Sequence, residues 1–132
     1  MITVSLSIVE LSKAIKSLDE ALQLYSKSTK GSQEQNAFRD ACIQRFEYCI
    51  ELSWKTSMKI LGSTTAAAKP AVREMARNNL IADSVQWLEF IEARNNTSHS
   101  YDEDIAKKVF AQILNFPPYA QALQTELQKI AK

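Results

Sequence analysis

Apolar side chains at the start of the chain recur at alternating spacings of three and four residues. This seam consists of Ile8, Leu11, Ile15, Leu18, Leu22 and Tyr25. The period is typical of a helix that packs in a bundle or a coiled coil, so we expect a helix over Val4–Lys27. Only two Gly and three Pro occur among the 132 residues, too few for the turns of a β-sandwich or barrel. The sequence therefore predicts an all-α protein.

Local signals divide the rest of the chain into further helices. We expect a second helix from Glu34 or Asn36 to Leu61, stopped by Gly62, and a short third helix from Lys69-Pro70-Ala71 to Asn78-Asn79. A fourth helix should run from a cap at Asp83-Ser84 to Asn95-Asn96, and a last one from Ser100 onward, interrupted at Pro117-Pro118. Asn95-Asn96 would end its helix in the left-handed conformation, and Ser100-Tyr101-Asp102-Glu103 would form a capping box. These elements predict a single domain over residues 1–132, an up-and-down four-helix bundle with one extra short helix.

The charge balance of the chain excludes one class of partner. Sixteen Lys and Arg residues against fifteen Asp and Glu residues give a formal net charge of +1. A dedicated duplex-DNA binder is excluded, because positive charge dominates the surface of such a domain. No run of about eighteen apolar residues is present, so we expect no membrane span and no membrane partner. The first residues do not resemble a signal peptide, and we expect a cytoplasmic protein.

The cysteines and the histidine do not form a metal site in the sequence. Cys42 and Cys49 lie seven residues apart in one expected helix. Their Cα atoms would be about 10 Å apart, beyond the roughly 7 Å reach of a disulfide, so we expect buried free thiols. Two cysteines and one histidine without the spacing of a zinc site predict no metal ligands. The sequence also has no Gly-rich phosphate loop, and we expect no cofactor.

The segment Arg94-Asn95-Asn96-Thr97-Ser98-His99-Ser100-Tyr101 contains the only histidine of the chain. On a continuous helix Arg94 and His99 would point about 140° apart, so they converge only if Asn95-Asn96 breaks the helix. With Ser100 as the cap, free N–H groups of the next helix would lie beside both side chains. Helix N-termini and arginine both favour anions, so we expect a phosphate pocket that includes Asn95 and Ser98.

A simpler interpretation of this segment remains open. Arg94 would pair with a nearby carboxylate, His99 would be an exposed loop residue, and Ser100 would only cap the next helix. The three acidic residues from Asp102 to Asp104 suit a helix start but repel RNA.

The segment from Arg39 to Tyr48 interleaves charged and amide side chains with large apolar ones in a helix that should be mostly buried. Buried charges must be paired, so we expect ion pairs of the type Arg45–Glu51 or Arg39–Glu47. The segment is either a solvated helix face or a polar cluster at a pocket, in which Arg39 and Arg45 bind a substrate or a phosphate. The residues alone leave both possibilities open.

Arg94, His99 and Tyr101 match the motif Arg-x-x-x-x-His-x-Tyr, and at these residues the chain resembles the HEPN superfamily of helical bundles. Two longer blocks, from Arg39 to Thr56 and from Arg94 to Glu103, more closely resemble the family of nucleotidyltransferase substrate-binding proteins. These are small bundles encoded beside a separate minimal nucleotidyltransferase. The resemblance covers most of the chain, roughly from the first helix to the last.

The resemblance implies two activities within a toxin–antitoxin-like gene pair. In the first, the chain binds a nucleotide or substrate for the nucleotidyltransferase partner. In the second, it is a metal-independent ribonuclease that the partner neutralises. His99 would then move a proton at the ribose 2′-OH or the leaving oxygen, and Arg94 would stabilise charge on the phosphorane. A third interpretation is a helical adaptor without a ligand.

Two further expectations concern Tyr101 and the assembly. The resemblance implies that the partner transfers AMP onto Tyr101, whose hydroxyl we expect to be exposed; in the alternative, the side chain only packs across the helix start. We also predict a homodimer. The second helix is apolar over a wide arc, and the reaction needs both an acid and a base whereas each chain has one histidine.

Overall fold

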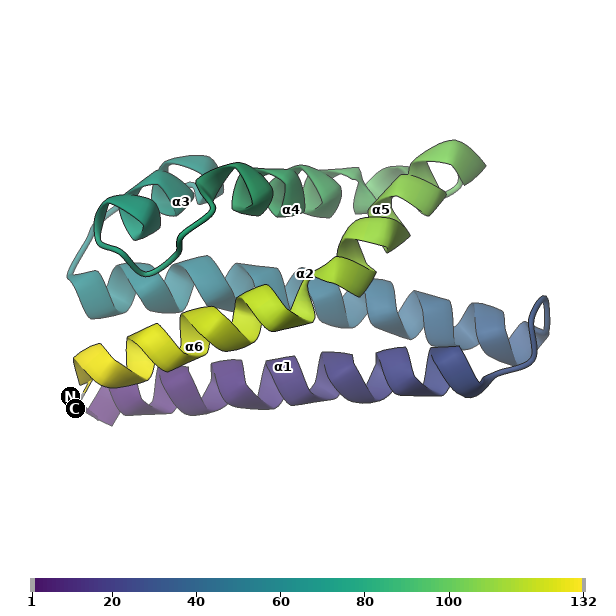
Figure 1. Cartoon of the computed structure of the whole chain (residues 1–132), viewed down its shortest axis with the longest axis horizontal. Coiled ribbons are helices and arrows are strands. Elements are labelled where there is room, and N and C mark those ends of the chain that lie inside the picture. Colours follow the sequence, from purple (N-terminus) through teal and green to yellow (C-terminus); the bar gives the residue numbers. More distant parts are fainter. Residues whose placement is uncertain (1, 132) are drawn as a thin grey trace.

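The computed structural model describes residues 2–131, which form six α-helices and one 3₁₀ turn (Figure 1). In chain order these are α1 (Ile2–Lys27), α2 (Gln33–Leu61), α3 (Ala68–Arg77), α4 (Ser84–Asn96), the 3₁₀ turn η1 (Thr97–His99), α5 (Glu103–Asn115) and α6 (Pro117–Ala131). The predicted all-α bundle is confirmed, and the expected last helix consists of two helices, α5 and α6.

The long helix α2 lies at the centre of the bundle (Figure 1). Helix α1 runs antiparallel beside it, α6 packs against both, and α3 and α4 cover the opposite side of α2. The two ends of the chain meet at one end of the molecule, and the junction between α4 and α5 lies away from them. Within residues 2–131 no helix is both long and apolar enough to cross a lipid bilayer.

The helices α1 and α2 follow the sequence signals closely. The α1 seam is buried at Ile8, Leu11, Ile15 and Leu18, and partly buried at Leu22 and Tyr25. Helix α2 begins after Ser32, whose side chain accepts a hydrogen bond from the Gln35 N–H. It ends at Gly62, which adopts the left-handed conformation with φ of 67°. Glycine has no Cβ to oppose this conformation, so the helix stops where the sequence predicts.

The middle of α2 forms the centre of the hydrophobic core. Phe46 and Ile50 have no exposed surface. The rings of Phe46 and Phe90 pack edge to face on Phe116, with centroids 5.2 and 5.0 Å away. Helices α1, α3, α4 and α6 cover this wide apolar arc within one chain. The arc therefore does not itself require a second copy, contrary to one of the two reasons for expecting a homodimer.

Both cysteines are free and buried, as predicted. Burial raises the pKa of the Cys42 thiol to about 11 and that of the Cys49 thiol to about 12. Because the thiolate is the reactive form, both side chains are inert core residues at neutral pH.

The junction between α4 and α5 differs from the prediction at both of its caps. Asn95-Asn96 does not stop α4 in the left-handed conformation: the helix includes both residues, Asn96 has φ of −87°, and the chain continues into η1. The capping box at Ser100 is also wrong, because Asp102 caps α5 and its carboxylate accepts the Asp104 N–H over 2.9 Å. Asp caps a helix as well as Ser does, and its charge also interacts favourably with the helix dipole.

The predicted interruption at Pro117-Pro118 is confirmed. Helix α5 ends at Asn115 and α6 begins at Pro117. Proline suits the first position of a helix, where its missing N–H would have no partner in any case. In Figure 1 α5 runs obliquely to α6, so the start of α5 and the η1 turn stand at the edge of the bundle.

Candidate functional site

Five of the predicted site residues lie in one short segment between the last turn of α4 and the start of α5. They are Arg94, Asn95, Ser98, His99 and Tyr101. Thr97 anchors the segment, because its side chain is buried and its hydroxyl donates to the Arg94 carbonyl over 2.8 Å. The Ser100 N–H donates to the Thr97 carbonyl and the Asp102 N–H to the His99 carbonyl, at 3.3 and 3.1 Å. These bonds fix the backbone and leave the histidine side chain exposed.

The two aromatic side chains of this segment lie edge to face. The ring centroids of His99 and Tyr101 are 6.1 Å apart and their planes are inclined by 73°. Tyr101 is 84% exposed, which confirms that its hydroxyl is open to solvent, although the residue precedes α5 rather than starting it. An acid–base group must come within hydrogen-bond reach of its substrate, and both side chains are accessible for this.

The side chain of Arg94 crosses to α2 and pairs with two carboxylates. Its Nη1 lies 3.2 Å from Glu47 Oε2, and its Nε lies 3.6 Å from Glu51 Oε1. Lys55 Nζ lies 3.4 Å from the other oxygen of Glu51. We call these four residues the Arg94 cluster; it contains two positive and two negative charges. Two parts of the simpler interpretation are confirmed, since Arg94 pairs with nearby carboxylates and His99 is exposed. Its third part, Ser100 as the cap of the next helix, is wrong.

The ion pairs expected within α2 are wrong. Among residues 2–131, neither Arg45–Glu51 nor Arg39–Glu47 forms an ion pair. Residues 45 and 47 point about 160° apart around a helix, so α2 turns Glu47 toward α4 and Arg45 toward α1. Arg45 instead donates from Nη1 to the Ser17 carbonyl of α1 over 2.9 Å.

The structure does not bring all predicted anion ligands together. Arg39 lies eight residues before Glu47, about 12 Å away along the helix axis, and its buried Nε has no hydrogen-bond partner. Asn95 and Ser98 are exposed beside His99, and the Ser98 hydroxyl donates to the Asn95 carbonyl over 3.4 Å. Phosphate binding by these residues stays a prediction.

The start of α5 is already occupied by a carboxylate of the chain. Asp102 Oδ1 accepts hydrogen bonds from the N–H groups of Asp104 and Ile105, at 2.9 and 3.2 Å. Glu103 and Asp104 add negative charge in the first turn. The anion-binding contribution expected from this helix start is therefore reduced by three acidic side chains.

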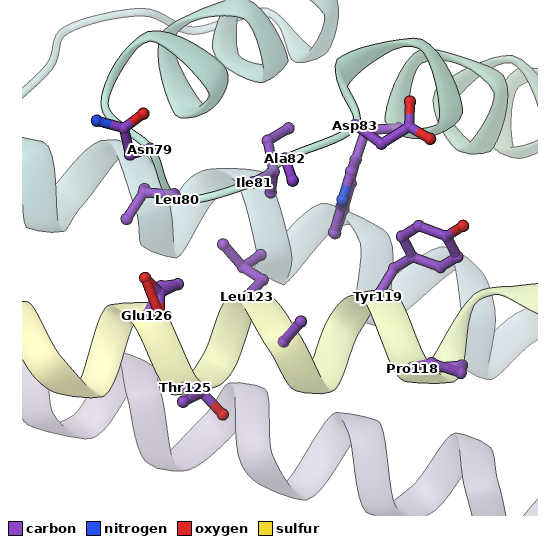
Figure 2. A pocket seen from close by; sticks show the side chains of 12 residues that line it. Asn79, Leu80, Ile81, Ala82, Asp83, Pro118, Tyr119, Leu123, Thr125 and Glu126 are labelled. Atoms are coloured by element: carbon purple, nitrogen blue, oxygen red, sulfur yellow. The ribbon is translucent and has the colours of Figure 1, made fainter.

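Other features of the molecule lie apart from this segment. A hollow of about 700 Å³ opens between the loop 79–83 and α6, and Figure 2 shows Leu123 and Tyr119 of α6 directed toward the loop. Its lining includes none of the predicted site residues. Among residues 2–131, no group of three His, Cys, Asp or Glu side chains is arranged to hold a metal ion.

The partners of Arg94 were not predicted from the sequence. Glu47, Glu51 and Lys55 follow one another at spacings of four residues and so share one stripe of α2. This acid–acid–base stripe is a signal that a cation from another helix packs between the two acids. Nothing in the sequence says which cation that is, because the answer depends on how α4 packs on α2.

Comparisons with known proteins give a consistent family. A family model described as "nucleotidyltransferase substrate binding protein like" matches residues 6–129. A curated relative from Haemophilus influenzae, named "Probable ribonuclease HepT", is 30% identical over 128 residues, which cover 88% of this chain and 88% of the relative.

Two solved structures resemble the fold. One, from Haemophilus influenzae, is described as the fold of a substrate binding domain of a nucleotidyltransferase. It has a TM-score of 0.78 and 28% identity, and the match covers 92% of this chain and 98% of that one. The other, from Thermus thermophilus, has a TM-score of 0.67 and 29% identity, with 90% and 99% of the two chains covered.

Proposed function

Because the chain belongs to the nucleotidyltransferase substrate binding protein-like family, we propose that it is a metal-independent ribonuclease that works in the cytoplasm with a separate minimal nucleotidyltransferase. One observation carries the proposal. The exposed imidazole of His99 ends the 3₁₀ turn that follows α4, and the last turn of α4 contains an arginine that two carboxylates hold against α2. The name of the Haemophilus influenzae relative supports the same activity. In this proposed pair of proteins the ribonuclease is the toxin-like member, and the nucleotidyltransferase is the antitoxin-like member that neutralises it.

The reaction is an attack of a ribose 2′-OH on the adjacent phosphorus. The bond from the 2′ oxygen to phosphorus forms and the bond to the 5′ oxygen breaks. A base takes the 2′-OH proton, and an acid gives a proton to the leaving 5′ oxygen. His99 performs one of these proton transfers, because its exposed imidazole can come within hydrogen-bond reach of a reacting oxygen. The guanidinium of Arg94 stabilises the added negative charge on the phosphorane.

The charge of the site favours cleavage over simple nucleotide binding. The Arg94 cluster contains two positive and two negative side chains, and three acidic residues follow Tyr101. A site that retains a nucleotide gains affinity from surplus positive charge, which this segment lacks. Each proton transfer needs an accessible side chain at the reacting oxygen, and the exposed imidazole of His99 meets this condition. A nucleotide-binding subunit without cleavage is the second candidate, favoured by the family description.

A second copy of the chain would complete the acid–base pair. Each chain has one histidine, whereas the reaction needs an acid and a base. We infer a homodimer whose two-fold axis places two copies of Arg94 and His99 along one groove. Sedimentation velocity at micromolar concentration should give a dimer. A monomer throughout the concentration range would contradict this arrangement.

Cleavage of RNA in the presence of EDTA tests the proposed activity. The wild-type protein should cleave, and His99→Ala should lower the rate by about 10²–10⁴-fold, the usual contribution of a proton-transfer group. Lys107→Ala, an exposed change on α5, is the matched control and should cleave at the wild-type rate. Cleavage by His99→Ala at the wild-type rate would contradict the proposal, and RNA binding without any cleavage would favour the second candidate.

Tyr101 is the proposed acceptor of AMP from the partner. Its oxygen would attack the α-phosphorus of ATP, pyrophosphate would leave, and the phenol proton would pass to solvent. An adenylyl group here would lie beside His99, because the two rings are in contact, and its phosphodiester charge would repel an RNA phosphate.

Co-expression with the nucleotidyltransferase followed by intact-mass spectrometry tests the modification. We expect an adenylyl mass shift that Tyr101→Phe abolishes. Tyr48→Phe is the matched control, because Tyr48 is also exposed, and it should leave the shift unchanged. A shift that persists in Tyr101→Phe would remove this residue from the mechanism.

A further inference from the structure

A second hollow, of about 480 Å³, opens between α1 and α2 on the side of α2 away from Arg94. Its lining includes Glu10, Lys13 and Ser17 of α1 and Gln44, Arg45 and Tyr48 of α2. None of them belongs to the Arg94 cluster. Unlike the cluster, the hollow has a surplus of positive charge, since Lys13 and Arg45 face a single carboxylate, Glu10.

The guanidinium of Arg45 is held in place at this hollow. Its Nη1 donates to the Ser17 carbonyl over 2.9 Å, which ties the side chain across the contact between the two helices. A guanidinium has five N–H donors, and this bond uses one of them. The remaining donors form a planar fork of the kind that binds phosphate oxygens.

An aromatic ring lies beside these cations. Tyr48 is 56% exposed, although large apolar side chains on α2 are otherwise mostly buried. An exposed ring next to positive charge is the usual arrangement for single-stranded nucleic acid, because each base can stack on the ring while cations contact the backbone. Gln44 is exposed one turn before Tyr48 and adds an amide that can hydrogen-bond to a base edge.

Tyr48 lies between the hollow and the Arg94 cluster around the circumference of α2. Tyr48 follows Glu47 directly and precedes Glu51 by three residues, so it points about 60° away from Glu51 around the helix. A strand that lies across α2 therefore passes from His99 and Arg94 to Tyr48 and Arg45 without crossing the hydrophobic core.

We propose that this hollow is a subsite for a nucleotide of single-stranded RNA that flanks the cleaved bond. The base stacks on Tyr48, its phosphate contacts Arg45 and Lys13, and Gln44 hydrogen-bonds to the base edge. The subsite supplies the affinity for RNA that the charge-balanced Arg94 cluster lacks. The choice of RNA as the ligand rests on the proposed function.

Fluorescence anisotropy with a short labelled single-stranded RNA measures the subsite separately from cleavage. All proteins carry His99→Ala, so the RNA stays intact. Tyr48→Ala should raise the Kd about tenfold, the typical effect of losing one stacked base. Tyr48→Phe keeps the ring and should restore the affinity, whereas Leu114→Ala, an equally exposed change on α5, should have no effect. Lys13→Ala should reduce the dependence of binding on salt.

The outcomes separate the subsite from the catalytic proposal. Unchanged affinity in Tyr48→Ala, or no RNA binding by the His99→Ala protein that serves as reference, overturns the subsite. Weaker binding by Tyr48→Ala, together with no cleavage by a protein that retains His99, supports the subsite and overturns the ribonuclease. With His99 present, Tyr48→Ala should raise KM for long RNA and leave cleavage of a dinucleotide unchanged, since a dinucleotide does not reach the hollow.

Discussion

The two sides of α2 differ sharply although one backbone carries both. On the inner side Phe46, Cys49 and Ile50 are completely buried among five other helices. On the outer side Tyr48 is exposed, and Glu47 and Glu51 are half-buried against Arg94. The inner side fixes the helix in place, so the outer side can hold charged and polar groups that contribute little to stability. Substitutions on the two sides should therefore change different properties.

The largest expected effect is on the inner side. Phe46→Ala removes a fully buried ring that packs on Phe116, and should lower the free energy of unfolding by about 3–5 kcal/mol. Tyr48→Ala, two residues away on the outer side, should lower it by less than about 0.5 kcal/mol. Urea unfolding followed by circular dichroism measures both. Equal losses would show that the two sides are not distinct.

The next effect is on activity. Arg94→Lys replaces a fork that reaches two carboxylates with a single ammonium group, and should reduce RNA cleavage about 10²–10³-fold. The melting temperature should hardly change, because partly exposed ion pairs contribute about 0–1 kcal/mol. Arg73→Lys on the exposed face of α3 is the control and should leave the rate unchanged. A fall in stability without a fall in rate would make Arg94 a structural residue.

The buried thiols make stability depend on pH at the alkaline end. Their pKa values are raised from 9.0 to about 11 and about 12, so the unfolded chain loses these protons first. The stability that the two buried thiols contribute is fully present below pH 9. It is lost as the pH rises through the pKa values of the thiols in the folded protein. Replacing both cysteines with Ala should remove this part of the decline. At pH 8 a thiol reagent should label no cysteine in the native protein and both in guanidinium.

The smallest effect concerns the two aspartate caps of α4 and α5. Asp83→Ala and Asp102→Ala should each lower the free energy of unfolding by about 1 kcal/mol, because each removes an N-cap. Only Asp102→Ala should also change the cleavage rate, because loss of its side-chain cap loosens the start of α5, to which the bond from the Asp102 N–H to the His99 carbonyl ties the η1 turn. Equal rates in the two variants would show that the cap does not position the histidine.

Features set by neighbouring residues were predicted well from the sequence, and features set by packing were not. The seam of α1, the stop at Gly62 and the break at Pro117 depend on local backbone preferences, and the structure has all three. Ser100 and Asp102 are both good N-caps, but Ser100 has the helical backbone conformation that ends η1, whereas Asp102 has the extended conformation that an N-cap needs.

The same limit applies to the site. The sequence places Arg94, His99 and Tyr101 in one segment and predicts the exposure of Tyr101. The partners of Arg94 are more than forty residues earlier in the chain, on a stripe of α2 that faces α4 only once the bundle has assembled. Local rules could identify that stripe but could not assign it to Arg94.

The chemical ends of the RNA fragments test the central claim most directly. If His99 and Arg94 promote attack by the 2′-OH, mass spectrometry of the products should show a 5′-hydroxyl on one fragment and a 2′,3′-cyclic phosphate on the other. A substrate with a 2′-deoxy residue at the cleaved position should remain intact, and His99→Ala should produce neither fragment. Fragments with a 5′-phosphate and a 3′-hydroxyl, or cleavage at the deoxy position, would contradict the account.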